Sequence, residues 1–190
     1  MMVKIVKKGN VIFQYSYLLP IILIYLVFNA YAPRHIFKKK MGIFEKGRVF
    51  CLKTLGAQLG KGAAVRKGLF ITDFSKFKLG KNSTLGPFAR LFLFDNFTVG
   101  DNVEIGSGLT VHTSEHLLND ASKPLGKQSS LRAPVSIASD VYLGSNVTIL
   151  SGAKIDSRVV VGACSLVKGH LESGFLYAGV PARKIRPLKN

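Results

Sequence analysis

The sequence predicts an all-β domain built on a six-residue repeat, preceded by an apolar helical segment and followed by a short C-terminal tail. Between residues 135 and 167, aliphatic side chains recur at a strict interval of six: Ile137, Leu143, Ile149, Ile155, Val161 and Val167. Neither an α-helix, of period 3.6, nor an ordinary strand, of period 2, explains equal steps of six, so this is an internal repeat. Small or β-branched residues stand two positions before each of the last five: Val141, Val147, Ala153, Val159 and Ser165.

This pattern resembles the hexapeptide repeat, in which one hexad forms one short strand and three hexads make one coil of a left-handed parallel β-helix. The resemblance implies that the aliphatic column points into a narrow triangular prism. The small residues would lie where the coil turns, and Gly144, Gly152 and Gly162 supply permissive backbone near these bends. We expect about five coils.

The chain begins with an apolar run about as long as a membrane helix. Residues 11–32 are apolar apart from Gln14, Ser16 and Asn29, and Pro20 is expected to end or kink a helix, leaving residues 21–32 as a second piece. A basic segment follows without a small-residue cleavage site, which disfavours a cleaved signal peptide. We expect a helix or helical hairpin that enters the cytoplasmic face of the membrane without crossing it. A single span and a packed core or interface helix are the alternatives.

The chain is strongly basic, and much of the excess lies near its N-terminus. Lys and Arg outnumber Asp and Glu by 27 to 10, and residues 1–53 contain ten basic side chains against Glu45 alone. Because these charges flank the apolar run, they indicate an anionic membrane surface reached through residues 1–40. No recognition helix or single-strand platform accompanies them, which argues against nucleic acid as the partner.

We therefore divide the chain into residues 1–54, a membrane-associating helical segment and basic connector, and residues 55–190, the β-helix domain. After Leu55 the period resumes with two-residue slips, which a longer corner or a bulge can absorb. This gives about three irregular coils before residue 111 and about two regular ones after residue 135. Residues 112–134 break the period and are rich in Ser, Lys, Asn and Pro. They predict an extended loop, a preferred place for chemistry.

Cysteine usage indicates a reducing compartment. Cys51 and Cys164 stand without CxxC spacing, so no disulfide framework is indicated. Cys164 lies inside the repeat and is interpreted as a small buried filler and not as a nucleophile or a zinc ligand. With the basic N-terminus, this favours the cytoplasmic side of the cytoplasmic membrane, through a peripheral or single-span anchor.

Three phrases, at this order and spacing, resemble the hexapeptide-repeat acetyltransferases, above all the maltose, galactoside and capsular-polysaccharide O-acetyltransferases: GLTVHTSEH, VYLGSNVTILSGAKI and AGVPARKIRPL. The resemblance implies an acyltransferase domain that moves an acetyl group from acetyl-CoA to a carbohydrate hydroxyl, without a metal. It also implies a homotrimer with grooves between subunits. A membrane-seeking N-terminus favours a lipid-linked acceptor in surface-polysaccharide biosynthesis, since a soluble acceptor needs no anchor.

The resemblance places the catalytic general base at His116. Family loops commonly read aliphatic, aromatic, Thr, any, any, His, and the corresponding stretch here runs from Val111 to His116. A sugar hydroxyl is a poor nucleophile at neutral pH, and a neutral imidazole can remove its proton during attack on the thioester. His112 stands where a tyrosine often does and is the second candidate. Glu115, Asp120 and Asp140 are candidates to orient the imidazole, with solvated carboxylates as the alternative.

Further site residues follow from the same resemblance. The acceptor is expected beside Asp95, His112 and Tyr142, although Phe88 and Arg90 occupy the place of the asparagine found in many relatives. A backbone N–H beside Ser145 is the candidate oxyanion donor. The residues expected to bind acetyl-CoA are Ser145, Ala163, Lys168, Arg183 and Arg186.

Two other functions are compatible with a β-helix. A γ-class carbonic anhydrase needs three histidine ligands for zinc. His112 and His116 find no third histidine in the nearby coils, because His170 is too far along the chain. A non-enzymatic trimeric scaffold at the membrane would need only the prism and the N-terminal segment.

Overall fold

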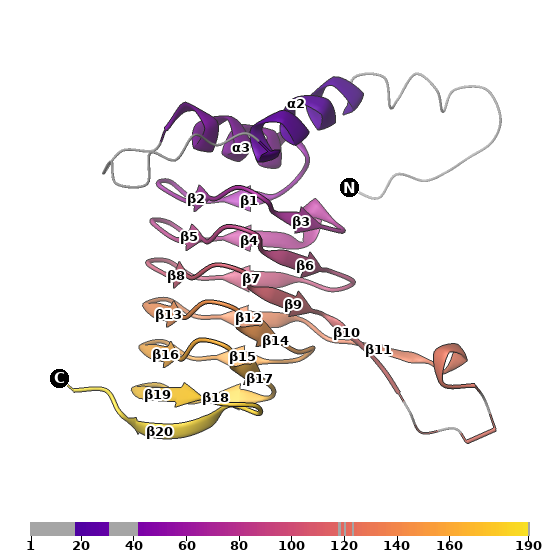
Figure 1. The fold of residues 1–190 in the computed structure, drawn as a ribbon, viewed down its shortest axis with the longest axis vertical. Helices are drawn as coiled ribbons and strands as arrows, with labels where there is room; N and C mark the ends of the chain where they lie inside the picture. Colours follow the sequence, from indigo (N-terminus) through magenta and orange to yellow (C-terminus); the bar gives the residue numbers. More distant parts are fainter. Residues whose placement is uncertain (1–17, 31–41, 118, 120, 123, 190) are drawn as a thin grey trace.

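The computed structural model describes residues 18–30, 42–117, 119, 121–122 and 124–189. Within these residues, short parallel strands stack into a triangular prism, with two helices across one end (Figure 1). Most of the segment predicted to seek the membrane, residues 1–40, lies outside the described residues, and so do His35 and Asp120. The prism is therefore the part of the chain on which a site can be located.

Three sheets form the sides of the prism, and we call them faces A, B and C. Face A contains β1 (Gln58–Leu59), β4 (Phe77–Leu79), β7 (Phe97–Val99), β12 (Val135–Ile137), β15 (Lys154–Ile155) and β18 (His170–Leu171). Face B contains β2 (Ala64–Val65), β5 (Thr84–Leu85), β8 (Glu104–Ile105), β13 (Val141–Leu143), β16 (Val159–Val161), β19 (Phe175–Ala178) and β20 (Arg183–Pro187). Face C contains β3 (Phe70–Ile71), β6 (Arg90–Phe92), β9 (Thr110–His112), β14 (Thr148–Ile149) and β17 (Leu166–Val167).

Successive strands pass from face A to B to C, so each round of three makes one coil. In the described chain there are five complete coils and part of a sixth, three before the loop and the rest after it. Ile137 pairs with Ile155, Leu143 with Val161 and Ile149 with Val167 on the three faces. All six are at most 3% exposed. The predicted column therefore forms the core, at a gain of about 2 kcal/mol for each buried aliphatic side chain.

The small column is buried but only partly lies at the turns: Ala153 and Ser165 precede β15 and β17, whereas Val141 and Val159 begin the strands β13 and β16. Val141, Ala153 and Ser165 are each at most 2% exposed. The first slip is absorbed where face C turns into face A, by the short helix η1 (Phe74–Lys76). Its N-cap, Asp73, accepts a hydrogen bond from the Ser75 amide at 3.0 Å. Longer corners of this kind keep equivalent positions 20 residues apart in the first coils, as in the pairing of Leu59 with Leu79.

Two packed helices, α2 (Leu18–Ala30) and α3 (Ile43–Thr54), cover the first coil (Figure 1). Pro20 lies in the first turn of α2, where a missing amide hydrogen costs little. Tyr25 and Asn29 of α2 donate to the Leu69 carbonyl at 3.1 and 3.0 Å. Helix α2 thus caps the edge of the prism through one side, as in the packed-helix alternative. No helix in the described part of the chain is long and apolar enough to cross a membrane.

The prism is interrupted once, where the extended loop was predicted. Strands β10 (Ser114–His116) and β11 (Ser130–Arg132) form an antiparallel hairpin that projects from the prism between the third and fourth coils (Figure 1). The short helix η2 (Leu125–Lys127) lies beyond them. On the far side of the excursion, β12 pairs with β7, Val135 beside Phe97, so the core continues without a change of register.

Candidate active site

The hairpin presents His116 to solvent with one hydrogen-bonding neighbour. His116 ends β10 opposite Ser130 of β11, and Ser130 Oγ lies 3.4 Å from His116 Nδ1. If Nδ1 carries the proton, it donates to Ser130 Oγ, and Nε2 is then free to accept a proton from a bound molecule. The hairpin therefore positions an imidazole that can act as a base.

The hairpin is anchored to the third coil by a buried threonine. Thr113, fully buried, accepts hydrogen bonds through Oγ1 from the amides of Phe94 and Asp95 at 2.8 and 2.9 Å. Its backbone carbonyl accepts from the Ala133 amide at 3.1 Å. Asp95 is thereby held at the base of the hairpin, beside the residue that follows His112. The structure therefore places Asp95 and His112 at the base of the hairpin that carries His116.

Two of the carboxylates considered as orienting partners, Glu115 and Asp140, make no hydrogen bond to the His116 ring within the described residues. Asp140 lines the groove on face B described below. Glu115 pairs with Leu131 in the hairpin, and its Oε1 is buried without a hydrogen-bond partner among the described residues. The neighbour of the His116 ring is instead Ser130. This pairing could not be read from the sequence, because it depends on the register of the hairpin.

Ser145 and Ala163 lie on adjacent coils at the corner between faces B and C. The Cys164 amide donates to the Ser145 carbonyl at 2.8 Å. The coils approach closely here, because a Cβ on Gly144 would come within 2.5 Å of the Ala163 nitrogen. In the described chain the Ser145 amide donates no hydrogen bond. Ser145 itself is half-buried, and its nitrogen lies close to Gly106 of the preceding coil. A backbone N–H without a partner can donate to a carbonyl oxygen.

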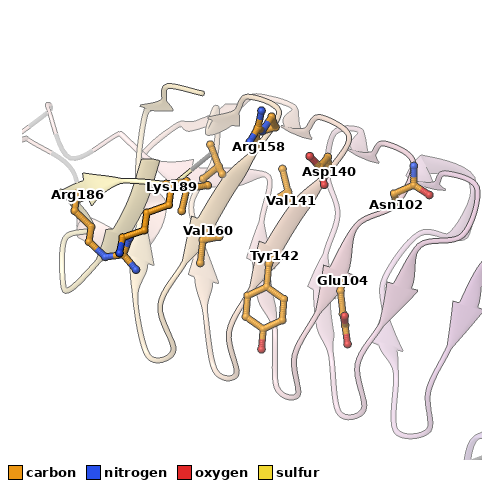
Figure 2. Close-up of a pocket in the computed structure, with 11 residues that line it drawn as sticks. Asn102, Glu104, Asp140, Val141, Tyr142, Arg158, Val160, Arg186 and Lys189 are labelled. Atoms are coloured by element: carbon orange, nitrogen blue, oxygen red, sulfur yellow. The ribbon is translucent and has the colours of Figure 1, made fainter. Parts of the chain in front are cut away.

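Tyr142 and Arg186 lie in a groove of about 550 Å³ on face B (Figure 2). Tyr142 lies in the centre of the groove and is 48% exposed. Glu104 lies on one side of it, and Arg186 and Lys189 lie toward the other (Figure 2). Arg186 comes from the last strand, β20, which turns back antiparallel to β19. The groove thus joins cationic and aromatic side chains that are far apart in the sequence. His116 is not among its lining residues.

The two remaining predicted residues, Arg183 and Lys168, are exposed. Arg183 begins β20 beside Ala178, close to the corner that carries Ala163. Lys168 directly follows β17 on face C, the face of His112. One chain therefore presents predicted residues on face C, on face B and at the corner between them, without enclosing them in one pocket.

The two cysteines have different surroundings. Cys51 is buried in α3, where burial raises the pKa of its thiol, and Cys164 is exposed. The interpretation of Cys164 as a buried filler is wrong, because its backbone takes a left-handed corner conformation, φ 59°, on the outside of the prism. In the described ranges, no group of three or more His, Cys, Asp or Glu side chains could hold a metal ion.

Comparison with known proteins identifies relatives, although no protein-family model matches the chain. The chain is 30% identical over 141 residues to the galactoside O-acetyltransferase of Escherichia coli K12, covering 73% of this chain and 68% of that protein. It is 27% identical over 157 residues to a putative colanic acid biosynthesis acetyltransferase of the same strain, covering 80% of each.

A solved structure shares the fold. It is a hexapeptide-repeat acetyltransferase of Vibrio cholerae in complex with acetyl coenzyme A, which superposes with a TM-score of 0.75 at 24% identity. The match covers 97% of this chain and 94% of that one. It confirms the predicted left-handed β-helix.

Proposed function

The chain belongs to the hexapeptide-repeat acetyltransferases, and on that premise we propose that it moves an acetyl group from acetyl-CoA to a carbohydrate hydroxyl with His116 as general base. The observation that carries this proposal is the exposed His116 ring, held by Ser130 on a hairpin anchored to the prism. A relative of 30% identity acts on galactosides by its name, and a solved structure of the same fold contains acetyl-CoA.

The reaction needs no covalent intermediate on the protein. As the acceptor oxygen attacks the thioester carbonyl carbon, its proton passes to Nε2 of His116. The tetrahedral intermediate then expels the CoA sulfur, which takes the proton back from the imidazolium. The products are an O-acetyl ester and CoA with a free thiol, and His116 returns to its neutral form. The proposed donor to the oxyanion is the Ser145 amide, which has no other partner in the described chain.

The proposed acetyl-CoA site runs along the corner of Ser145 and Ala163 toward the C-terminal strand. Arg183 is exposed near this corner, and Arg186 lines the groove of face B. Guanidinium groups pair with phosphates through directed donors, so both suit the nucleotide end of CoA. Lys168 would reach it from face C. Asp95, His112 and Tyr142 are assigned to the acceptor side.

We further propose that the active form is a homotrimer, because His116 is not enclosed by its own chain and the proposed residues are divided between two faces. A neighbouring prism would close the site. Light scattering after size exclusion, in mild detergent, should give about three times the 20.7 kDa of one chain. A stable, active monomer would contradict this assembly.

A role in surface-polysaccharide synthesis is favoured by the relatives that carry such names and by the outer side of α2. Leu23, Ile24, Leu26 and Val27 of this helix are 47 to 58% exposed. An apolar helix side flanked by basic sequence is suited to an anionic membrane surface, where a lipid-linked acceptor would lie. The full chain should float with vesicles containing anionic lipid, and Leu23→Ser with Val27→Ser should abolish flotation. Equal flotation of both proteins would refute the membrane contact.

Acceptor-dependent release of CoA tests the activity itself. The protein is incubated with acetyl-CoA and a panel of glycans, and free thiol is followed with time. We expect at least one glycan to give turnover in the wild type, and His116→Ala to lower it by at least about 100-fold, the usual contribution of a general base. If no glycan exceeds the rate of His116→Ala, the proposed function is wrong.

A further inference from the structure

Face C carries a line of three neighbouring rings that ends at the hairpin of His116. The Phe70 and Phe92 rings lie 5.4 Å apart, tilted by 49°. Phe92 and His112 stack at 4.8 Å, within 6° of parallel, since they occupy paired positions on β6 and β9. We call Phe70, Phe92 and His112 the aromatic ladder. Phe70 is 51% exposed, so the ladder is a surface feature and not part of the core.

An unpaired cation lies within this surface. Arg90 of β6 pairs in register with Phe70 on one side and Thr110 on the other. It is exposed, and in the part of the chain that the structure describes its guanidinium has no hydrogen bond or ion pair. An arginine fixed on a rigid strand and free of a carboxylate can bind an anion from solution.

Within the strands of face C the only charge is positive, while Asp73 and Asp95 lie beyond the strands, at the corner where face C turns into face A. None of the five strands of face C contains an acidic residue. At its two edges, Lys67 lies 5.6 Å from the Phe88 ring centre and Arg132 lies 5.7 Å from that of Phe94. These edge contacts keep further positive charge close to aromatic surface. Face B, by contrast, has Glu104 and Asp140 along its groove.

From this arrangement we infer that face C binds a sugar residue bearing a carboxylate, with its ring on Phe92 and Phe70 and its carboxylate on Arg90. The apolar side of a pyranose packs on aromatic rings, and a carboxylate accepts two parallel hydrogen bonds from a guanidinium. His112 ends the ladder, and the hairpin of His116 starts two residues later. The site therefore leads an acidic glycan to the proposed base. This inference rests on the proposed function.

The inference is tested with matched neutral and acidic acceptors. One set consists of methyl galactoside, methyl galacturonoside and galactose 6-phosphate, and two similar sets are derived from glucose and mannose. Within each set, the neutral, carboxylate and phosphate acceptors are compared, using the full chain and acetyl-CoA. We expect at least one uronide to have a kcat/KM at least about tenfold above its neutral parent, the range of one charge-assisted hydrogen bond. Preference for the phosphate over every uronide would contradict the assignment of a carboxylate.

Two variants and one control identify the surface. Arg90→Gln should lower kcat/KM for the preferred uronide by about 10- to 100-fold and that for its neutral parent less than threefold. Phe92→Leu should lower kcat/KM by about fivefold for both the uronide and its neutral parent. Lys78→Gln removes an exposed cation from face A of the same coil and should change neither. A similar loss with Lys78→Gln, or an unchanged preference in Arg90→Gln, would overturn the inference.

Binding separates this inference from the transfer reaction. Saturation-transfer NMR without acetyl-CoA should detect the uronide on wild-type protein and on His116→Ala, and show its loss in Arg90→Gln. If binding follows this pattern while no acetyl transfer occurs, the proposed function fails and the acidic-sugar site remains. If acetyl transfer occurs to neutral glycans alone and no uronide binds, the proposed function remains and the acidic-sugar site is wrong.

Discussion

Among single residues, His116 is distinguished by the different surroundings of its two ring nitrogens. Nδ1 lies beside Ser130 Oγ, and the exposed side chain leaves Nε2 open to a bound molecule. A neutral hydroxyl gives an imidazole a preferred direction, but adds no charge that would hold a proton on it. Ser130 is therefore a positioning residue, and its contribution should be modest.

Replacing Ser130 with Ala should lower kcat by about three- to tenfold, the value of one neutral hydrogen bond. The KM for acetyl-CoA should stay within twofold, because Ser130 lies on the hairpin and not at the proposed CoA corner. Steady-state kinetics over pH 5 to 9 would separate these effects. The exposed neighbour Ser129 provides the control as Ser129→Ala. A fall in kcat of equal size in both variants would indicate a general disturbance of the hairpin.

The exposed Cys164 reports on the proposed CoA corner, since it follows Ala163 and its amide bonds to Ser145. With acetyl-CoA at ten times its Kd, alkylation of Cys164 by N-ethylmaleimide should slow by about tenfold, because only the free fraction reacts. Buried Cys51, whose pKa is raised by burial, should react in denaturant alone. Peptide mass spectrometry would measure both sites. Unchanged alkylation of Cys164 with saturating acetyl-CoA would place the CoA site elsewhere.

At the scale of elements, the two-helix cap is joined to the prism by polar contacts as well as apolar ones. Arg48 is 1% exposed and donates from Nε to the Val65 carbonyl at 2.8 Å and from Nη1 to the Phe28 carbonyl at 2.6 Å. Burial lowers the pKa of its guanidinium. One side chain thus donates hydrogen bonds both to a carbonyl at the edge of the first coil and to a carbonyl near the end of α2.

Arg48→Met should therefore destabilise the protein by about 3 kcal/mol, because two buried carbonyls lose their donors while the volume is nearly kept. The free energy of unfolding in urea is the measurement. Lys46→Met on the exposed side of α3 is the matched control and should lie within about 0.5 kcal/mol of wild type. Equal losses in the two variants would show that the cap does not depend on the buried guanidinium.

The last strand, β20, is fixed by an exposed ion pair. Lys184 Nζ lies 2.6 Å from Glu172 Oε2 and 3.9 Å from the Phe175 ring centre. The hydrogen bond from Lys184, followed by its charge, lowers the pKa of Glu172. A lowered folded-state pKa means that this stabilisation is present above the unfolded pKa of Glu and is lost as the pH falls through the folded value.

Glu172→Gln should therefore speed amide hydrogen exchange of residues 183–186 at pH 7, and the difference from wild type should shrink as the pH falls from 7 to 3. Comparing both proteins at each pH removes the intrinsic pH dependence of exchange. Lys154, which pairs with Asp156 on β15, gives the control Lys154→Gln, with no effect on β20. A difference that persisted undiminished at pH 3 would exclude the ion pair as its cause.

At the scale of the whole molecule, the prism follows from the sequence because one period governs every inward position. Ile137, Leu143 and Ile149 could be assigned to the core by counting in sixes, and the excursion at 112–134 by the failure of that count. The outward side was harder to predict. Phe92 stacks on His112 because early coils contain 20 residues, and the pairing of His116 with Ser130 depends on a hairpin outside the repeat.

The same reason explains why the groove was not predicted as a unit. Tyr142 and Arg186 are separated in sequence, and their proximity depends on the antiparallel return of β20 on face B. The sequence predicted a short C-terminal tail after the repeat, but the return of a strand onto its neighbour follows no period. Interior positions were thus predictable from the repeat. Surface neighbours could not be predicted without the lengths of the coils, the hairpin of β10 and β11, and the antiparallel return of β20.

The central claim is that acetyl passes directly from CoA to a glycan oxygen with His116 as the base. Its most direct measurement uses acetyl-CoA carbon-13-labelled in the acetyl group, with a glycan acceptor, followed by mass spectrometry of glycan and protein. We expect label on the glycan as an ester, none on the protein during turnover, and loss of transfer in His116→Asn. Labelled protein that passes its acetyl group on, or undiminished transfer by His116→Asn, would contradict it.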